Sequence, residues 1–171
     1  VGSEMCIRDR YWFWRIDYYL WEQRELFFKN ELLNVVEKYV FRRNRSIEHI
    51  APQHPKDEYG DKTRFYWDDE SRPEVAWKRD CLGNMVMISS GQNSTLTNSC
   101  FEVKHAVMQR YASGNGTVES LKMLYVYSKY SSWSLDNIDE HHLFSMKVLK
   151  CSYERDSRGW NDFHNINMRK L

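Results

Sequence analysis

The stretch of sequence that decides the fold is SIEHIAPQ, residues 46–53, which is followed after a long polar interval by LGNMV, residues 82–86. A short apolar run that stops at Pro52 predicts a strand ending beside His49, because proline cannot continue a sheet ladder. The apolar run MVMI, residues 85–88, predicts a second short, buried strand. The two runs together predict a pair of strands with a polar histidine at the end of the first.

The interval between these strands, residues 54–81, has no clean periodicity and carries an acidic cluster at 68–70. A loop of this length in a compact domain is usually functional, so we interpret it as an insertion. A short helix is expected within it at about 73–78. The sequence SSGQ, residues 89–92, breaks the second strand.

Most of the remaining chain predicts helices, because apolar residues recur at helical spacing behind plausible capping residues. Asn30, Thr117 and Ser134 are the expected caps of three of them. A further helix is expected to open near Thr97 or Asn98. The expected helical ranges are 11–29, 31–40, 97–112, 117–127 and 134–150.

Composition fits one folded domain, since 42% of the 171 residues are hydrophobic and 29% are charged. The aromatic content of 15% predicts a large aromatic core, with a base-stacking surface as the alternative. The formal net charge is only +1, so any DNA contact must come from local basic patches.

The first ten residues, VGSEMCIRDR, resemble a translated sequencing adapter, and we expect the chain to be a fragment of a larger protein. Without them, three scattered cysteines remain at 81, 100 and 151, and they form no Cys-x-x-Cys pair that would suggest a zinc knuckle. No apolar run reaches the ~18 residues needed to cross a bilayer. We therefore expect a cytoplasmic protein with no membrane partner.

The order of these motifs resembles an HNH (His-Me finger) nuclease. The Glu-His-Ile-x-Pro-Gln and Gly-Asn elements resemble, more closely, the C-terminal domain of GmrSD-type modification-dependent restriction endonucleases. The resemblance implies an α+β fold with a small ββα-metal core surrounded by helices. It also implies a metal-dependent DNA endonuclease, the effector part of a restriction or defence enzyme, with DNA and an N-terminal nucleotide-dependent domain as partners.

On this basis we expect the chain to be divided into four parts after the adapter-like segment 1–10. They are an N-terminal helical segment at 11–45, the ββα-metal core at 46–112 with its insertion at 54–81, C-terminal helices at 113–150, and an unassigned polar tail at 151–171.

The resemblance places His49 as the general base, which suits an imidazole because its pKa is near neutrality. Asn84 is implied to be supportive, its amide orienting the histidine through the loop backbone. Glu48 and Asn93 are implied to hold Mg²⁺ or Mn²⁺, both of which accept oxygen ligands. Glu48 is the less secure ligand, because neighbours on a regular strand point to opposite faces.

Basic residues near these motifs are candidate contacts for nucleic acid, and a solvated turn or helix face is the alternative interpretation. These candidates are Arg42, Arg43, Arg45, Lys104 and His105, with Arg110 further along the same expected helix as the last two. Two other functions stay open: a catalytically inactive nucleic-acid-binding or regulatory HNH-like module, and a helical structural domain whose motif match is chance.

Overall fold

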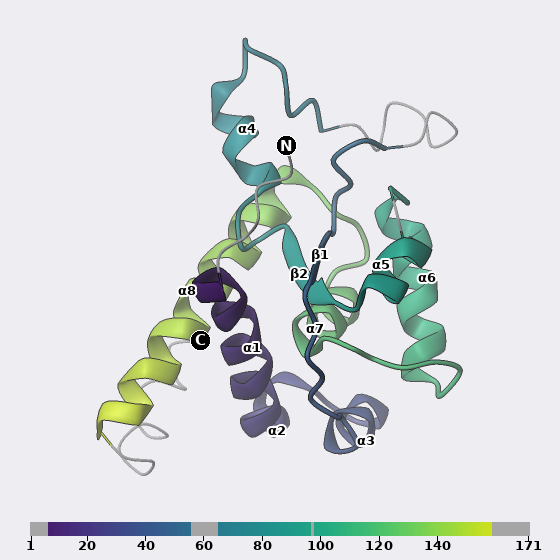
Figure 1. Cartoon of the computed structure of the whole chain (residues 1–171), viewed down its shortest axis with the longest axis vertical. Helices are drawn as coiled ribbons and strands as arrows, with labels where there is room; N and C mark the ends of the chain where they lie inside the picture. Colours follow the sequence, from purple (N-terminus) through teal and green to yellow (C-terminus); the bar gives the residue numbers. More distant parts are fainter. Residues whose placement is uncertain (1–6, 56–64, 97, 159–171) are drawn as a thin grey trace.

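The computed structural model of the chain describes residues 7–55, 65–96 and 98–158 (Figure 1). It is a mostly helical α+β fold with one small antiparallel sheet. The described elements are α1 Ile7–Glu22, α2 Arg24–Phe27, α3 Glu31–Glu37, β1 Ser46–His49, α4 Pro73–Arg79, β2 Met85–Ile88, α5 Ser90–Leu96, α6 Phe101–Ala112, α7 Leu121–Lys129 and α8 Leu135–Arg158.

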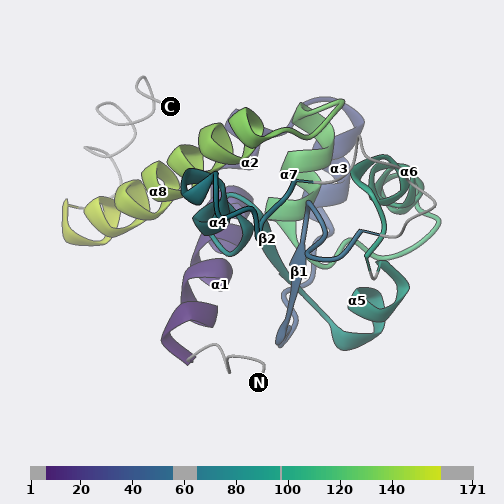
Figure 2. The ribbon, with the colours of Figure 1, turned by 90° about the horizontal axis from the view of Figure 1, so that it is seen from above.

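Both predicted strands are confirmed, and they pair antiparallel with Ser46 opposite Ile88 and His49 opposite Met85. A two-stranded sheet is marginal alone in water, so it needs helices packed against it. Helix α1 contacts β2 and helix α5 contacts β1. Seen from above in Figure 2, the strands lie between α1 and α5, with α7 and α8 toward the top of the view.

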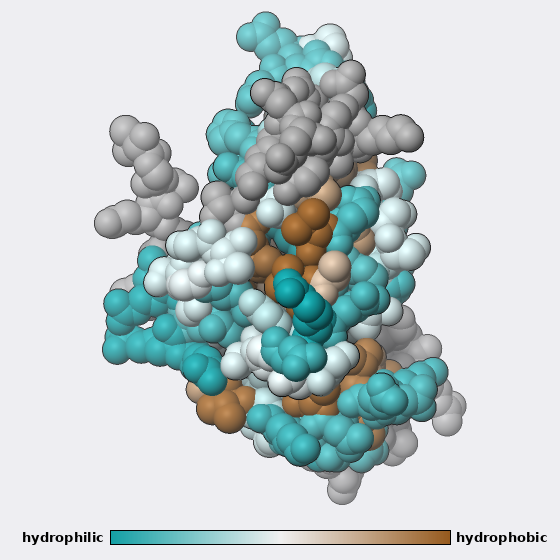
Figure 3. All heavy atoms as spheres, turned by 90° about the vertical axis from the view of Figure 1, so that its right-hand side faces the viewer, coloured by the Kyte–Doolittle hydropathy of each residue, from teal (hydrophilic) through white to brown (hydrophobic). Residues whose placement is uncertain are grey.

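The hydrophobic core lies where α1, α7 and α8 meet the sheet. Its fully buried members include Ile16 of α1, Val86 of β2, Val126 of α7, and Ile138 and Val148 of α8. Polar residues cover most of the face drawn in Figure 3, with apolar atoms exposed in patches between them. The core therefore fixes one side of the strand pair and leaves the end of β1 near the surface.

The helix expected at 97–112 is confirmed as α6, although it begins at Phe101, and Asn93 does not stand at its start. Asn93 lies in the separate short helix α5, which ends at Leu96, and α6 begins only at Phe101. Asn98 has a positive φ of 50°, a left-handed conformation that commonly ends a helix. Asn93 is therefore not on the helix that carries Lys104 and His105.

The C-terminal helices also differ from prediction at their ends. Ser120, and not Thr117, caps α7, because its side chain accepts a hydrogen bond from the backbone N–H of Met123. Ser134 does cap α8, accepting from the N–H of Asn137. Helix α8 runs to Arg158, past the predicted Lys150, so the tail predicted at 151–171 begins as helix. The reason is tertiary: Arg15 of α1 donates to the hydroxyl of Ser152 at 2.7 Å.

Smaller predictions can be compared in the same way. The short helix within the insertion is confirmed as α4, while residues 56–64 of that insertion lie outside the described chain. Helix α1 stops at Glu22, short of the predicted 29, and begins at Ile7, inside the adapter-like segment. The cysteines at 81, 100 and 151 are buried and free. Among the described helices, none is both long and apolar enough to cross a membrane.

Candidate active site

His49 is the last residue of β1, and the backbone that follows it is fixed by hydrogen bonding and burial. The N–H of Ile50 donates to the carbonyl of Asn84 at 2.8 Å, and Ile50, Ala51 and Pro52 are buried. The imidazole itself is half-buried, and its Nε2 lies 2.9 Å from Oδ1 of Asp80. The end of the strand thus presents a histidine paired with a carboxylate.

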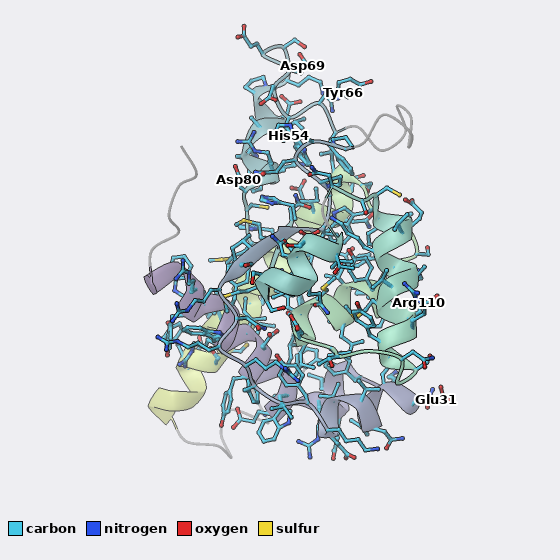
Figure 4. All side chains as sticks on the ribbon, turned by 45° about the vertical axis from the view of Figure 1, so that its right-hand side comes forward. Glu31, His54, Tyr66, Asp69, Asp80 and Arg110 are labelled. Carbon is cyan, nitrogen blue, oxygen red and sulfur yellow. The ribbon has the colours of Figure 1, made fainter. Side chains whose placement is uncertain are left out.

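Asp80, the partner of His49, was not predicted from the sequence. It directly follows α4, and its carboxylate is shared: Gln53 donates to Oδ1 at 3.2 Å, and Nε of Arg79 donates to Oδ2 at 2.9 Å. Arg79 also reaches Asp68 at 3.4 Å. In Figure 4, Asp80 lies at the same end of the molecule as the labelled His54, which belongs to the loop after β1. The one signal in the sequence was an acid just before the Gly-Asn turn.

The pKa shifts of His49 and Asp80 indicate which of the two side chains carries the shared proton. Burial lowers the pKa of His49 below its usual value, although the hydrogen bond and charge of Asp80 oppose the change. Burial acts to raise the pKa of Asp80, but the hydrogen bonds from His49 and Arg79 outweigh it, and the pKa lies below its usual value. A carboxylate only accepts, so the neutral imidazole donates from Nε2, and Nδ1 keeps its lone pair.

Asn84 is fully buried and joins three parts of the chain that surround the pair. Its Oδ1 accepts from the N–H of Ala51 at 2.8 Å and from the indole of Trp133 at 3.2 Å. Its amide donates to the carbonyls of Ala51 at 3.1 Å and Arg79 at 3.0 Å. The side chain therefore ties the loop after His49 to the residue before Asp80, a geometry that supports the orienting role implied for it.

Glu48 points away from His49, to the other side of β1. Its carboxylate lies 2.6 Å from Nζ of Lys104, and both side chains are buried. Burial raises the pKa of Glu48 and lowers that of Lys104, and each charge opposes the shift of the other. Lys104 also donates to the carbonyl of His49 at 2.5 Å and lies 3.4 Å from that of Ile50. With a side chain 1% exposed, Lys104 braces the strand end, and this burial corrects its prediction as a phosphate contact.

A second buried lysine, Lys122 of α7, braces the start of β2 and was also missed. Its Nζ donates to the carbonyls of Leu82 at 2.6 Å and Met85 at 2.8 Å, and burial lowers its pKa to about 7. Between these carbonyls lies Gly83, where a Cβ would come within 2.2 Å of the carbonyl oxygen of Ile138. Only glycine allows the turn to approach α8 this closely.

The other predicted site residues are more dispersed. Helix α5 packs on β1 and so places Asn93 beside the strand that carries His49, but it is Asp80 that the imidazole contacts. His105 is half-buried and stacks on Phe101 with ring centroids 5.8 Å apart. Arg110 is exposed near the end of α6, far from Asp80 in Figure 4.

The three predicted arginines of the turn before β1 are all exposed. They precede Ser46 and therefore lie beyond the opposite end of β1 from His49. A strand rises about 3.3 Å per residue, which puts the backbone of Arg45 about 13 Å from that of His49. They do not surround the imidazole but continue the surface away from it. These arginines are Arg42, Arg43 and Arg45.

The predicted metal ligands do not fit a shared metal site. The carboxylate of Glu48 is engaged by Lys104 on the face of β1 opposite His49, so it cannot join Asn93 and the base. Within the described residues, no group of three or more histidine, cysteine or acidic side chains is placed to hold a metal ion. The oxygen donors beside His49 are those of Asp80 and Gln53; these two side chains are hydrogen-bonded to each other, and Asp80 is bonded to the histidine as well.

The site is a histidine–carboxylate pair at the end of a short strand of an α+β fold, braced by a buried asparagine. Residues 4–144 match the family model described as GmrSD restriction endonucleases, C-terminal domain, and the chain belongs to that family. The resemblance predicted from the motifs is confirmed. No curated protein and no solved structure matches the chain. Membership makes the chain a restriction-endonuclease-type nuclease domain, and it implies a DNA substrate and a preceding domain in the enzymes of the family.

Proposed function

We propose that this domain hydrolyses phosphodiester bonds in DNA with His49 as the general base, and that it is the effector part of a restriction or defence enzyme. The observation that carries the proposal is the His49–Asp80 hydrogen bond of 2.9 Å at the end of β1. A base must be neutral and correctly oriented before it can accept a proton. Burial favours the neutral form of His49, and the contact with Asp80 orients the ring.

In the proposed reaction, Nδ1 of His49 removes a proton from a water molecule while Nε2–H remains bonded to Asp80. The resulting hydroxide attacks the phosphorus in line with the departing 3′ oxygen, and that oxygen takes a proton from solvent. The products are a 5′ phosphate and a 3′ hydroxyl. Asp80 stabilises the imidazolium that forms, as the aspartate of a Ser-His-Asp triad does, although Asp80 is more exposed than that aspartate.

Arg79 is a cation that shares the carboxylate partner of His49. Its Nε is bonded to the same carboxylate as His49, and an Nη atom of its partly buried guanidinium lies 3.4 Å from Asp68. We assign it to the phosphate, whose negative charge increases in the transition state. A guanidinium suits this role because its planar donors match phosphate oxygens.

A divalent cation, Mg²⁺ or Mn²⁺, belongs to the proposal through the resemblance to HNH nucleases. When bound, such an ion stabilises the charge on the phosphate and on the leaving oxygen. Glu48 does not fit as its ligand, and the steps above use only residues of this chain. Asn93, beside β1, remains the oxygen donor assigned to it.

The test is the variant His49→Ala, with supercoiled plasmid nicking and thermal melting measured on the same preparation. Loss of a general base is expected to lower the cleavage rate about 10²- to 10⁴-fold. The melting temperature should hardly change, because the imidazole makes its hydrogen bond to an exposed acid. The matched control is His54→Ala, which removes an exposed histidine from the loop after β1 and should leave the rate unchanged. Parental nicking by His49→Ala would remove this residue from the mechanism.

A further inference from the structure

Four aromatic side chains and several arginines gather on one surface beside the start of β1. The rings come from two segments: Tyr18 and Trp21 of α1 lie against Phe41 with centroid distances of 5.9 and 5.8 Å. Tyr39 adds a ring 4.9 Å from Phe41. Tyr18 and Phe41 are 43% and 44% exposed, which is unusual for rings that already pack together. We call this set, with Arg24, Arg42, Arg43 and Arg45, the aromatic–arginine surface.

The turn before β1 is the positively charged part of this surface, in a chain of net charge +1. Between Glu37 and Glu48 the sequence holds Lys38 and the three arginines of the turn, and no acid. Arg24 lies over the ring of Trp21 at 5.6 Å, with Glu37 4.0 Å away as its acidic neighbour. A local basic patch is what a nearly neutral domain needs to contact a phosphate backbone.

The surface is also held rigid from beneath. The hydroxyl of Tyr39 and the amide of Asn44 both donate to the carbonyl of Glu119, at 2.9 and 2.7 Å. Asn44 is buried, so the arginines at 43 and 45 on either side of it face solvent. A rigid platform loses little conformational entropy when a ligand binds.

We propose that the aromatic–arginine surface binds a DNA strand with unpaired bases, the bases stacking on Tyr18 and Phe41 and the phosphates pairing with the arginines. Exposed rings beside arginines are the chemistry that recognises single-stranded nucleic acid. A base sandwiched between two rings needs about 7 Å, twice the 3.4 Å stacking distance. The 5.9 Å between Tyr18 and Phe41 is too small for this, so bases stack on the outer faces.

The inference rests on the proposed function in one respect, because the distance from this surface to the cleaved phosphate is counted from His49. The backbone of Arg45 lies about 13 Å from that of His49, which corresponds to about four nucleotide steps at 3.4 Å each. The surface therefore binds nucleotides that lie several positions along the strand from the phosphate that is hydrolysed. Binding itself does not require catalysis, so the two can be tested separately.

The experiment is fluorescence anisotropy of the full chain with a labelled single strand and with a duplex of equal length, in chelator and at several salt concentrations. Tyr18→Ala and Phe41→Ala should each weaken single-strand binding at least about fivefold and leave duplex binding nearly unchanged. Neutralising the three turn arginines to glutamine should weaken binding to both and lower the single-strand salt slope by about 0.7 for each phosphate that is no longer bound.

Matched controls are Tyr153→Ala, whose ring on α8 is 47% exposed, and Lys150→Gln, an exposed cation on the same helix. His49→Ala should bind as the parent does, which separates this proposal from the failure of the nuclease assignment. The proposal is overturned by parental affinity in the ring variants, by equal losses in the controls, or by a parent that binds no single strand. A parent that dimerises, and that Phe41→Ala makes monomeric, would make the surface a protein interface and overturn it as well.

Discussion

Asp80 controls the chemistry of His49 through one hydrogen bond, which makes it the most informative residue to change. In Asp80→Asn the side chain no longer forces Nε2 to carry the proton, so we expect the cleavage rate to fall by at least about tenfold. Asp80 raises the pKa of His49 against the effect of burial, so losing its charge should lower that pKa further. Because only the neutral base is active, the rise of rate with pH should move to lower pH. The measurement is a pH–rate profile.

The control for this change is Asp68→Asn, which removes an exposed acid that contacts Arg79 and not His49. Its pH profile should match the parental one. A profile for Asp80→Asn that keeps the parental midpoint would show that the two side chains are not coupled in solution.

At this scale the sequence predicted the residues that belong to a local motif. His49 and Asn84 could be singled out because each stands at a fixed place beside a strand and a turn, and their catalytic roles remain predictions. The role of Asp80 and the burial of Lys104 could not be predicted, because both depend on contacts between distant segments. Lys104 and His49 are 55 residues apart in the sequence, and Asp80 and His49 are 31 residues apart. The spacing of charges along a helix does not reveal which one is buried.

The strand β1 depends on one side chain of α6, which gives a test at the level of elements. In Lys104→Met the carboxylate of Glu48 stays buried without its cation, which should cost about 3–5 kcal/mol in the free energy of unfolding. The double variant Glu48→Gln with Lys104→Met removes both charges and should recover only part of this. The carbonyls of His49 and Ile50 still lose their donor. Urea denaturation measures all three proteins.

Lys150→Met is the matched control, because that exposed lysine lies 3.9 Å from Glu154 and should matter by less than about 1 kcal/mol. A cost for Lys104→Met as small as that of the control would show that α6 does not brace the strand end.

The sequence predicted which helices and strands exist where the local pattern was strong, but it did not predict where they end. The two strands and α4 follow from an apolar run, a proline and a following polar stretch. Helix α5 was not predicted, and it is separated from α6 where Asn98 adopts a left-handed conformation, which a non-glycine residue takes only when its surroundings favour it. The extension of α8 likewise depends on Arg15, in a helix more than 100 residues earlier, since Ser152 is 137 residues away.

For the whole molecule, metal removal separates activity from folding. Chelation with EDTA should stop plasmid nicking, because the phosphate charge loses its divalent partner. The melting temperature should not change, since the described core is made of apolar side chains and holds no cluster of three metal-type ligands. Restoring Mg²⁺ or Mn²⁺ should restore cleavage. Undiminished nicking in excess chelator would show that the residues of this chain suffice.

The acid stability of the fold should depend on His141, a fully buried histidine of α8. Among the described residues neither of its ring nitrogens has a hydrogen-bond partner, and the rings of Tyr125 and Phe144 stack beside it at 6.0 and 5.5 Å. Burial lowers its pKa well below the usual value, and the charges of Lys122, Lys129 and His142 act in the same direction. The folded chain therefore cannot take the proton that the unfolded chain binds below about pH 6.5.

In terms of sign, the stability that His141 contributes is complete above about pH 6.5 and is lost as the pH falls toward its folded pKa. His141→Phe keeps a ring of similar shape and removes the titrating group. The difference in melting temperature between variant and parent should then grow in favour of the variant as the pH falls from 7 to 5. The difference is the quantity to measure, because Asp17, whose pKa burial raises to about 7, changes stability in the opposite direction in both proteins. Parallel curves would show that His141 reaches solvent before the fold opens.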